Sequence, residues 1–215
     1  MPYSTVSIPS SFPTTSRPVY LYPTATMSKK EILSAVPAIL RAMDTIVSHY
    51  HPDDRILIHS VSYDLGRTIH DHLARRTDRP VTTYSDSNSK HGGIQQYLSR
   101  RGSILIAPSL DRGVDFPYDQ CRAIIIPKVP FPNLADKQVS ARLHSPGGQI
   151  WYNVKTIRTL IQMTGRGMRS EDDHCASYIL DKQFIDIIWR KCQYLIPEWW
   201  KASLVLDCGV LRHDK

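Results

Sequence analysis

Four short apolar runs recur along the middle of the chain. They read RILIHS (55–60), SILIAP (103–108), AIIIPKV (123–129) and ASYILD (176–181). Each run is long enough for one buried strand. Stretches with helical spacing separate the runs, near residues 64–75, 91–100, 133–143 and 149–169. Continuous apolar strands that alternate with helices are typical of a parallel sheet covered on both faces. The pattern therefore predicts a three-layer α/β fold.

Weaker signals add elements on both sides of this pattern. Strands are expected at 81–84 and 19–22, and helical regions at about 28–50 and 183–201. Ser28 and Glu31 have the spacing of a capping box that would open the first of these helices, and Pro37 should kink or restart it. Trp199 and Trp200 near the end of the last helix are expected to pack rather than to stack on bases.

The two ends of the chain differ in composition from the middle. Residues 1–16 carry no charged side chain and are rich in Ser, Thr and Pro, which predicts a linker or flexible arm. The expected domain covers residues 17–207, and residues 208–215 form a short tail.

Composition sets loose limits on function. Lysine and arginine number 27 against 20 acidic residues, a net charge of +7 that is compatible with a polyanionic partner but common in other proteins. The cysteines lack the CxxC spacing of zinc or iron–sulfur sites, so reduced thiols and no bound metal are expected. No apolar run approaches the roughly 18 residues of a membrane span, and no signal peptide follows Met1. A cytoplasmic protein without a membrane partner is expected.

The predicted helix at 149–169 has two distinct lines of side chains. A core-facing line contains Ile150, Val154, Ile157, Ile161, Thr164 and Met168, and a basic line contains Lys155, Arg158, Gln162, Arg166 and Arg169. Gly165 and Gly167 flank Arg166 and would clear space around it, so its guanidinium could clamp a phosphate. The alternative is a solvated basic face, on which Arg166 and Arg169 pair with the acidic residues at 171–173.

The loop after the strand at 103–108 reads SLDRGVDFP, residues 109–117. Gly113 would permit a tight turn, and Asp115 would place a carboxylate near the carboxyl edge of the sheet, where ligands bind in open parallel sheets. An ordinary surface turn is the alternative for this loop.

These motifs together resemble a known family. Gln162, Gly165, Arg166 and Arg169 form the Q-x-x-G-R-x-x-R pattern of motif VI in superfamily 2 helicases. The segment that follows it, RSEDDHCASYILDKQF, is similar to the DinG/XPD-like branch. GVDFP resembles motif V of that branch, ILIHSVSYDLG (56–66) resembles its motif IV, and KVPFPNLAD (128–136) is also similar. The resemblance covers nearly the whole chain and implies a RecA-like second motor domain.

The resemblance also implies roles for individual residues. Arg166 and Arg169 would supply the arginine finger, and Gln162 would sense or position the nucleotide. Gly113, Asp115 and Gly165 would bind the nucleotide or couple its site to DNA. The residues expected along the track for single-stranded DNA are Ser60, Ser62, Tyr63, Ser109, Lys128 and Asn133. Without the resemblance, His59 and Tyr63 would be read as packing or capping residues.

Two motifs of a complete motor do not occur in the sequence. The 215 residues contain neither G-x-x-x-x-G-K-[ST] nor D-E-x-H. In the family a first motor domain carries both and therefore holds most of the ATP and Mg²⁺. The chain is thus expected to be the C-terminal half of an ATP-dependent DNA helicase, inactive alone, with the N-terminal helicase domain as a partner in cis or as a separate chain. The alternative is a non-catalytic module that binds nucleic acid or a protein.

Overall fold

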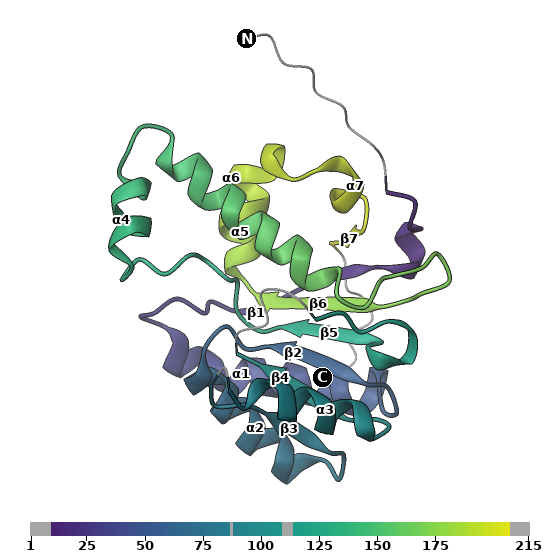
Figure 1. Cartoon of the computed structure of the whole chain (residues 1–215). Helices are drawn as coiled ribbons and strands as arrows, with labels where there is room; N and C mark the ends of the chain where they lie inside the picture. Colours follow the sequence, from purple (N-terminus) through teal and green to yellow (C-terminus); the bar gives the residue numbers. More distant parts are fainter. Residues whose placement is uncertain (1–9, 87, 109–113, 207–215) are drawn as a thin grey trace.

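A single parallel sheet runs through the molecule (Figure 1). The computed structural model describes residues 10–86, 88–108 and 114–206. Its seven strands are β1 (Val19–Ala25), β2 (Ile56–His59), β3 (Val81–Thr83), β4 (Ile104–Ala107), β5 (Ala123–Ile126), β6 (Ala176–Asp181) and β7 (Leu204–Val205). Their order is β3-β4-β2-β5-β6-β1-β7, and every neighbouring pair is parallel. The predicted fold class is confirmed.

Helices cover both faces of the sheet. One face is packed by α1 (Ile32–Thr45), the π-helix η2 (Ile46–Tyr50) and α2 (Tyr63–Arg76). The other face is packed by α3 (Lys90–Ser99), α5 (Gly148–Thr164) and the π-helix η4 (Phe184–Trp189). The shorter helical segments are η1 (Thr14–Ser16), η3 (Tyr118–Gln120), α4 (Lys137–Leu143), α6 (Arg190–Cys192), η5 (Gln193–Leu195) and α7 (Glu198–Lys201).

The central strands are buried on both sides, which explains their continuous apolar sequences. All four residues of β2, of β4 and of β5 are buried. Successive side chains alternate between the faces, so Leu57 and Leu105 join the core under α5 while Ile56, Ile58 and Ile104 join the core under α1 and α2.

The first long helix differs from its prediction in two respects. The Ser28 hydroxyl bonds the Glu31 carboxylate at 2.7 Å instead of capping the backbone, and α1 begins only at Ile32. The helix also continues through Pro37 without a new start. The carbonyl of Leu33 loses its usual donor there, but Leu33 is exposed, so water can take the place of that donor.

Together α1 and η2 form a 19-residue run, Ile32–Tyr50, that is long and apolar enough to cross a membrane by length and hydropathy. The expectation that the chain has no such run is therefore wrong. The structure accounts for the apolar residues within the domain, because Ile39, Met43 and Ile46 pack on the sheet. In addition, Asp44 bonds His72 of α2 at 2.8 Å.

Both ends of the described chain pack close to the end of α5. The region predicted as one helix at 183–201 is broken into η4, α6, η5 and α7. Trp200 is buried and its indole N–H donates to the Thr164 hydroxyl at 3.0 Å, as packing predicts, while Trp199 is partly exposed beneath the Arg17 guanidinium. From the predicted arm, Phe12 packs against the core of the domain.

Candidate functional site

The helix that carries the basic line ends earlier than the sequence predicts. α5 stops at Thr164, and residues 165–170 form an irregular turn, which we call the GRGMRS turn. The predicted core-facing line is confirmed in part. Ile157, Thr164 and Met168 are buried, but Ile150 is 51% exposed, and the buried face also includes Asn153, Thr156 and Leu160. Consequently Arg166 and Arg169 do not continue the line of Lys155, Arg158 and Gln162, which are exposed on the helix.

The two glycines of the turn have structural explanations. Gly165 is the residue at which α5 ends. A Cβ at Gly167 would lie 2.5 Å from Cys175 Sγ and 2.9 Å from the Cys121 carbonyl oxygen. The expectation that both glycines clear space around Arg166 is therefore wrong for Gly167, which allows a buried close approach between the turn and the neighbouring chain.

Arg166 points into the domain. The residue is only 6% exposed, and its Nη1 donates to the carbonyl of Val114 and lies 3.9 Å from Asp115 Oδ1. Its own carbonyl accepts the N–H of Phe116 at 3.1 Å. Through its backbone and its guanidinium, Arg166 thus fixes residues 114–116, the described end of the motif V loop.

Arg169 is the accessible arginine of the turn. Its side chain is 44% exposed, and its guanidinium pairs directly with Asp115, whose side chain is 52% exposed. Asp115 therefore lies between two arginines that follow it by more than fifty residues in sequence. Exposed ion pairs of this kind contribute little to stability, about 0–1 kcal/mol, so a competing anion could replace the carboxylate.

The buried carboxylate of Asp173 holds this arrangement, although the sequence suggested arginine side chains as its partners. Asp173 accepts backbone N–H groups from Tyr118 at 2.8 Å, Arg169 at 2.9 Å and Ser170 at 3.2 Å. Its other neighbour is the guanidinium of Arg122, at 3.7 Å. The alternative in which Asp173 pairs with the side chains of Arg166 and Arg169 is therefore wrong, since Asp173 binds the backbone of the turn.

His59 lies at the carboxyl end of β2 and is almost fully buried. Within the described part of the chain, neither ring nitrogen has a hydrogen-bond partner. Burial, and then the positive charge of Arg166, lower the pKa of His59 to about 3, which the nearby backbone of Met163 only partly opposes. The imidazole is therefore neutral near pH 7. The sequence offered no signal for this environment beyond the position of His59 at the end of an apolar strand.

The residues predicted to contact DNA fall into two groups at the carboxyl edge of the sheet. Ser60 is buried and donates to the Ser62 carbonyl at 3.1 Å, and the Ser62 hydroxyl accepts the Leu65 N–H as the N-cap of α2. Tyr63 is exposed beside them. Lys128 and Asn133 follow β5, the strand next to β2.

Two predicted site residues, Ser109 and Gly113, lie outside the described residues. No group of three or more metal-binding side chains gathers anywhere in the described ranges. Cys121, Cys175 and Cys192 are buried free thiols, and the Cys121 side chain together with burial raises the pKa of Cys175.

Comparison with known proteins identifies the family of the chain. The family model for the helicase C-terminal domain matches residues 46–203. The chain is 34% identical over 97 residues to the Fanconi anemia group J protein homolog of Gallus gallus, covering 39% of this chain and 8% of that protein. It is 27% identical over 151 residues to the ATP-dependent DNA helicase CHL1 of Saccharomyces cerevisiae strain YJM789, covering 61% of this chain and 16% of that protein. The chain thus spans a small part of these relatives.

The fold also matches solved structures. The structure of S. tokodaii Xpd4 aligns with a TM-score of 0.60 at 15% identity, covering 89% of this chain and 38% of that one. An identity this low supports the fold alone.

Replacement of Gly167 by alanine should destabilise the domain. The added Cβ meets a buried side chain and a backbone carbonyl, and overpacking of this kind costs about 1–3 kcal/mol. Urea unfolding would measure the loss. The matched control is Gly92→Ala in α3, where no heavy atom of the described residues lies within 4 Å, so the stability should stay equal or rise by up to about 1 kcal/mol. Equal effects of the two substitutions would contradict the packing role of Gly167.

His59 should make the domain less stable in mild acid. The unfolded chain takes up a proton near pH 6.5, whereas the folded chain does so only at about 3. The contribution of His59 to the free energy of unfolding is therefore fully present above pH 6.5. It is lost as the pH falls toward 3, by at most about 1.4 kcal/mol per pH unit. His59→Phe should flatten the dependence of unfolding free energy on pH between 6 and 4. His91→Phe, at an exposed position, should leave it unchanged. A slope that His59→Phe does not alter would refute the assignment.

Proposed function

Because the chain belongs to the helicase C-terminal domain family, in its DinG/XPD-like branch, we propose that it is the second motor domain of an ATP-dependent DNA helicase. The observation that carries the proposal is the placement of Asp115 between Arg166 and Arg169. Residues of motifs V and VI, which are far apart in sequence, meet there in one cluster of charge, in which Asp115 and Arg169 are partly exposed and Arg166 is buried.

Arg169 is the better candidate for the arginine finger. Its partly exposed guanidinium, held by the Asp115 carboxylate and by the Met168 carbonyl at 3.1 Å, could turn toward a phosphate on another domain. There it would offset the negative charge that develops on the terminal phosphate, an effect that contributes about 10³ to 10⁵ in rate in comparable enzymes. Arg166 is buried and would instead keep the motif V segment in position, and the exposed Gln162 would contact the nucleotide from the last turn of α5.

A first motor domain would complete the site. Its phosphate loop would bind ATP and hold Mg²⁺, which would supply positive charge to offset the negative charge of the phosphates. Because the sequence of this chain contains no phosphate loop, its residues would line the side of the cleft that faces the first motor domain. When Arg169 turns toward the phosphate, it would release the carboxylate of Asp115. Asp115 could then bind another group, and in this way would link the nucleotide cleft to the DNA track. Single-stranded DNA would contact the turn after β2 and the segment after β5, near Tyr63, Lys128 and Asn133.

A non-catalytic binding module remains the second candidate. The net charge of +7 favours it as well as the motor. The accessible arginine beside Asp115 distinguishes the two, since a module that only holds DNA has no use for a phosphate-sensing arginine.

The chain alone should hydrolyse no ATP, because its sequence contains no phosphate loop to hold the nucleotide. Phosphate release from the purified chain, with and without single-stranded DNA, would measure this. Turnover that co-purifies with the chain through successive columns and responds to Arg169→Ala would overturn the division of labour between the two domains.

In the protein that unites this chain with a first motor domain, Arg169→Ala should lower kcat for ATP hydrolysis by about 10³. The affinity for single-stranded DNA should change little, because the finger acts on the nucleotide. Arg169→Lys should recover only part of the rate, since lysine lacks the planar fork of arginine. Arg75→Ala, at an exposed position on α2, is the matched control and should turn over normally. If Arg169→Ala retained full turnover, the assignment of the finger would be wrong.

A further inference from the structure

The helical hairpin formed by α4 and α5 has an unusual charge. The sequence from 137 to 169 contains Lys137, Arg142, Lys155, Arg158, Arg166 and Arg169, and no aspartate or glutamate. The nearest preceding acid, Asp136, is occupied as the N-cap of α4, where it accepts the N–H groups of Gln138 and Val139. The hairpin therefore carries cations without an internal counter-charge.

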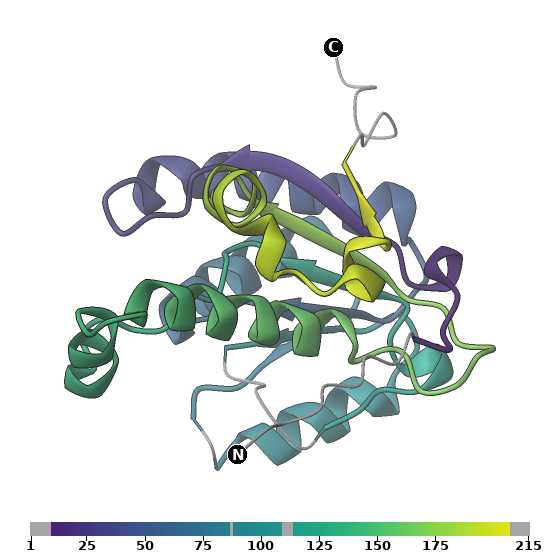
Figure 2. The same cartoon turned by 90° about the horizontal axis from the view of Figure 1, so that it is seen from above.

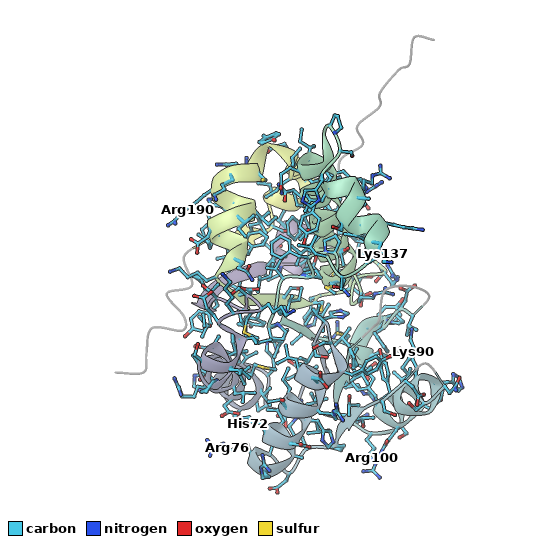
Figure 3. All side chains as sticks on the ribbon, turned by 90° about the vertical axis from the view of Figure 1, so that its left-hand side faces the viewer. His72, Arg76, Lys90, Arg100, Lys137 and Arg190 are labelled. Atoms are coloured by element: carbon cyan, nitrogen blue, oxygen red, sulfur yellow. The ribbon has the colours of Figure 1, made fainter. Side chains whose placement is uncertain are left out.

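The hairpin projects from the body of the domain. Figures 1 and 2 show α4 and the start of α5 extending beyond the sheet, and Figure 3 shows Lys137 on this projecting part. The two helices are closely joined, since a Cβ at Gly148 would collide with the carbonyls of Arg142 and Leu143. The hairpin can therefore present its side chains in a fixed arrangement.

Trp151 gathers two of the cations. The guanidinium of Arg142 on α4 lies 4.6 Å from the centre of its ring, and the ammonium of Lys155, one turn further along α5, lies 5.3 Å from it. Each cation is attracted by the indole, an interaction of about 0.5–1 kcal/mol at an exposed site. Two like charges are thus held together on one aromatic side chain, where they repel each other.

These cations have no carboxylate partner among the residues that the structure describes. In the described ranges, Lys137, Arg142, Lys155 and Arg158 make no ion pair. Elsewhere on the surface Arg55, Arg67, Arg76, Arg122 and Arg190 all lie near a carboxylate. Unlike these five arginines, the four hairpin cations have no carboxylate beside them in the described ranges, and an external polyanion would supply the missing negative charge.

We propose that the α4–α5 hairpin binds the phosphate backbone of single-stranded nucleic acid, and that Trp151 positions Arg142 and Lys155 for this contact. The proposal rests on the proposed function for its choice of a nucleic acid over an acidic protein. It adds a contact outside the helicase motifs, on a segment that follows β5 and so continues from Lys128 and Asn133 at the carboxyl edge of the sheet. The contact is independent of base identity, because phosphates carry no sequence information.

The test is binding of fluorescein-labelled oligo(dT) to the full chain, followed by anisotropy over a series of salt concentrations. The double substitution Arg142→Ala and Lys155→Ala should weaken binding about tenfold at low salt. It should also reduce the slope of log affinity against log salt by about 1.4, since each phosphate contact on a single strand contributes about 0.7. The matched control, Arg100→Ala with Arg101→Ala, removes the same charge from exposed residues at the end of α3. Its effects on the affinity and on the salt slope should each be less than half of those of the hairpin double variant. Figure 3 places Arg100 well apart from Lys137.

The role of Trp151 has its own readout. Trp151→Phe keeps an aromatic face and should bind oligo(dT) within about twofold of the parent chain, whereas Trp151→Leu should weaken binding several-fold at an unchanged salt slope. Thermal unfolding of each variant separates this effect from a loss of folding. Equal binding by the phenylalanine and leucine variants would refute the positioning role.

Three results would overturn the proposal. The first is that the parent chain does not bind oligo(dT) at low salt, and the second is that the hairpin and control double variants have equal effects. The third is that the hairpin double variant loses binding to polyglutamate while its binding to oligo(dT) is unchanged. The last result would identify a docking site for an acidic protein. Failure of the proposed motor function is distinguishable, because it would appear as normal ATP turnover in Arg169→Ala while the hairpin variants still lost binding to oligo(dT).

Discussion

The candidate site depends on one buried carboxylate. Asp173 accepts backbone N–H groups from Tyr118, Arg169 and Ser170, and so fastens the segment after motif V to the turn of motif VI. Each buried donor or acceptor that loses its hydrogen-bond partner lowers the stability of the fold by about 1–3 kcal/mol. The position of Arg169 relative to Asp115 is therefore set by the backbone and not by the weak ion pair between the two side chains. The surface pair can exchange partners while the turn itself remains fixed.

The same cluster separates two arginines that look equivalent in sequence. Arg166 supports the loop through the Val114 carbonyl and the Phe116 N–H, and Arg169 remains accessible. The proposed motor function would use both properties, because a charge that reaches another domain would need a rigid base. Burial of His59 in its neutral form fits this arrangement, since a second positive charge beside Arg166 would be costly.

The sequence was sufficient for the fold because strands buried on both faces must be apolar along their whole length, as β2, β4 and β5 are. It was also sufficient for the family, whose motifs are local in sequence. It could not give the burial of Arg166 or the role of Gly167, since each depends on a neighbour distant in the chain: Val114 for Arg166, and Cys121 for Gly167. The end of α5 was missed for a different, local reason. Helical periodicity assumes that a helix continues, and here Gly165 ends it. The charge on α4 and α5 was visible in the composition, but its exposure and its lack of partners were not.

The place of β1 in the sheet has a consequence for how the domain is made. Val19 pairs with Ser177 on one side and with Leu204 on the other, so the first strand of the domain fills a gap between two strands from its far end. During synthesis β1 has no partner until almost the entire domain has been translated. Contacts this distant in sequence slow folding, and an unpaired apolar strand is prone to join the wrong neighbour. A truncation that removes β7 would leave β1 as an edge strand, and one that also removes β6 would leave it with neither neighbour.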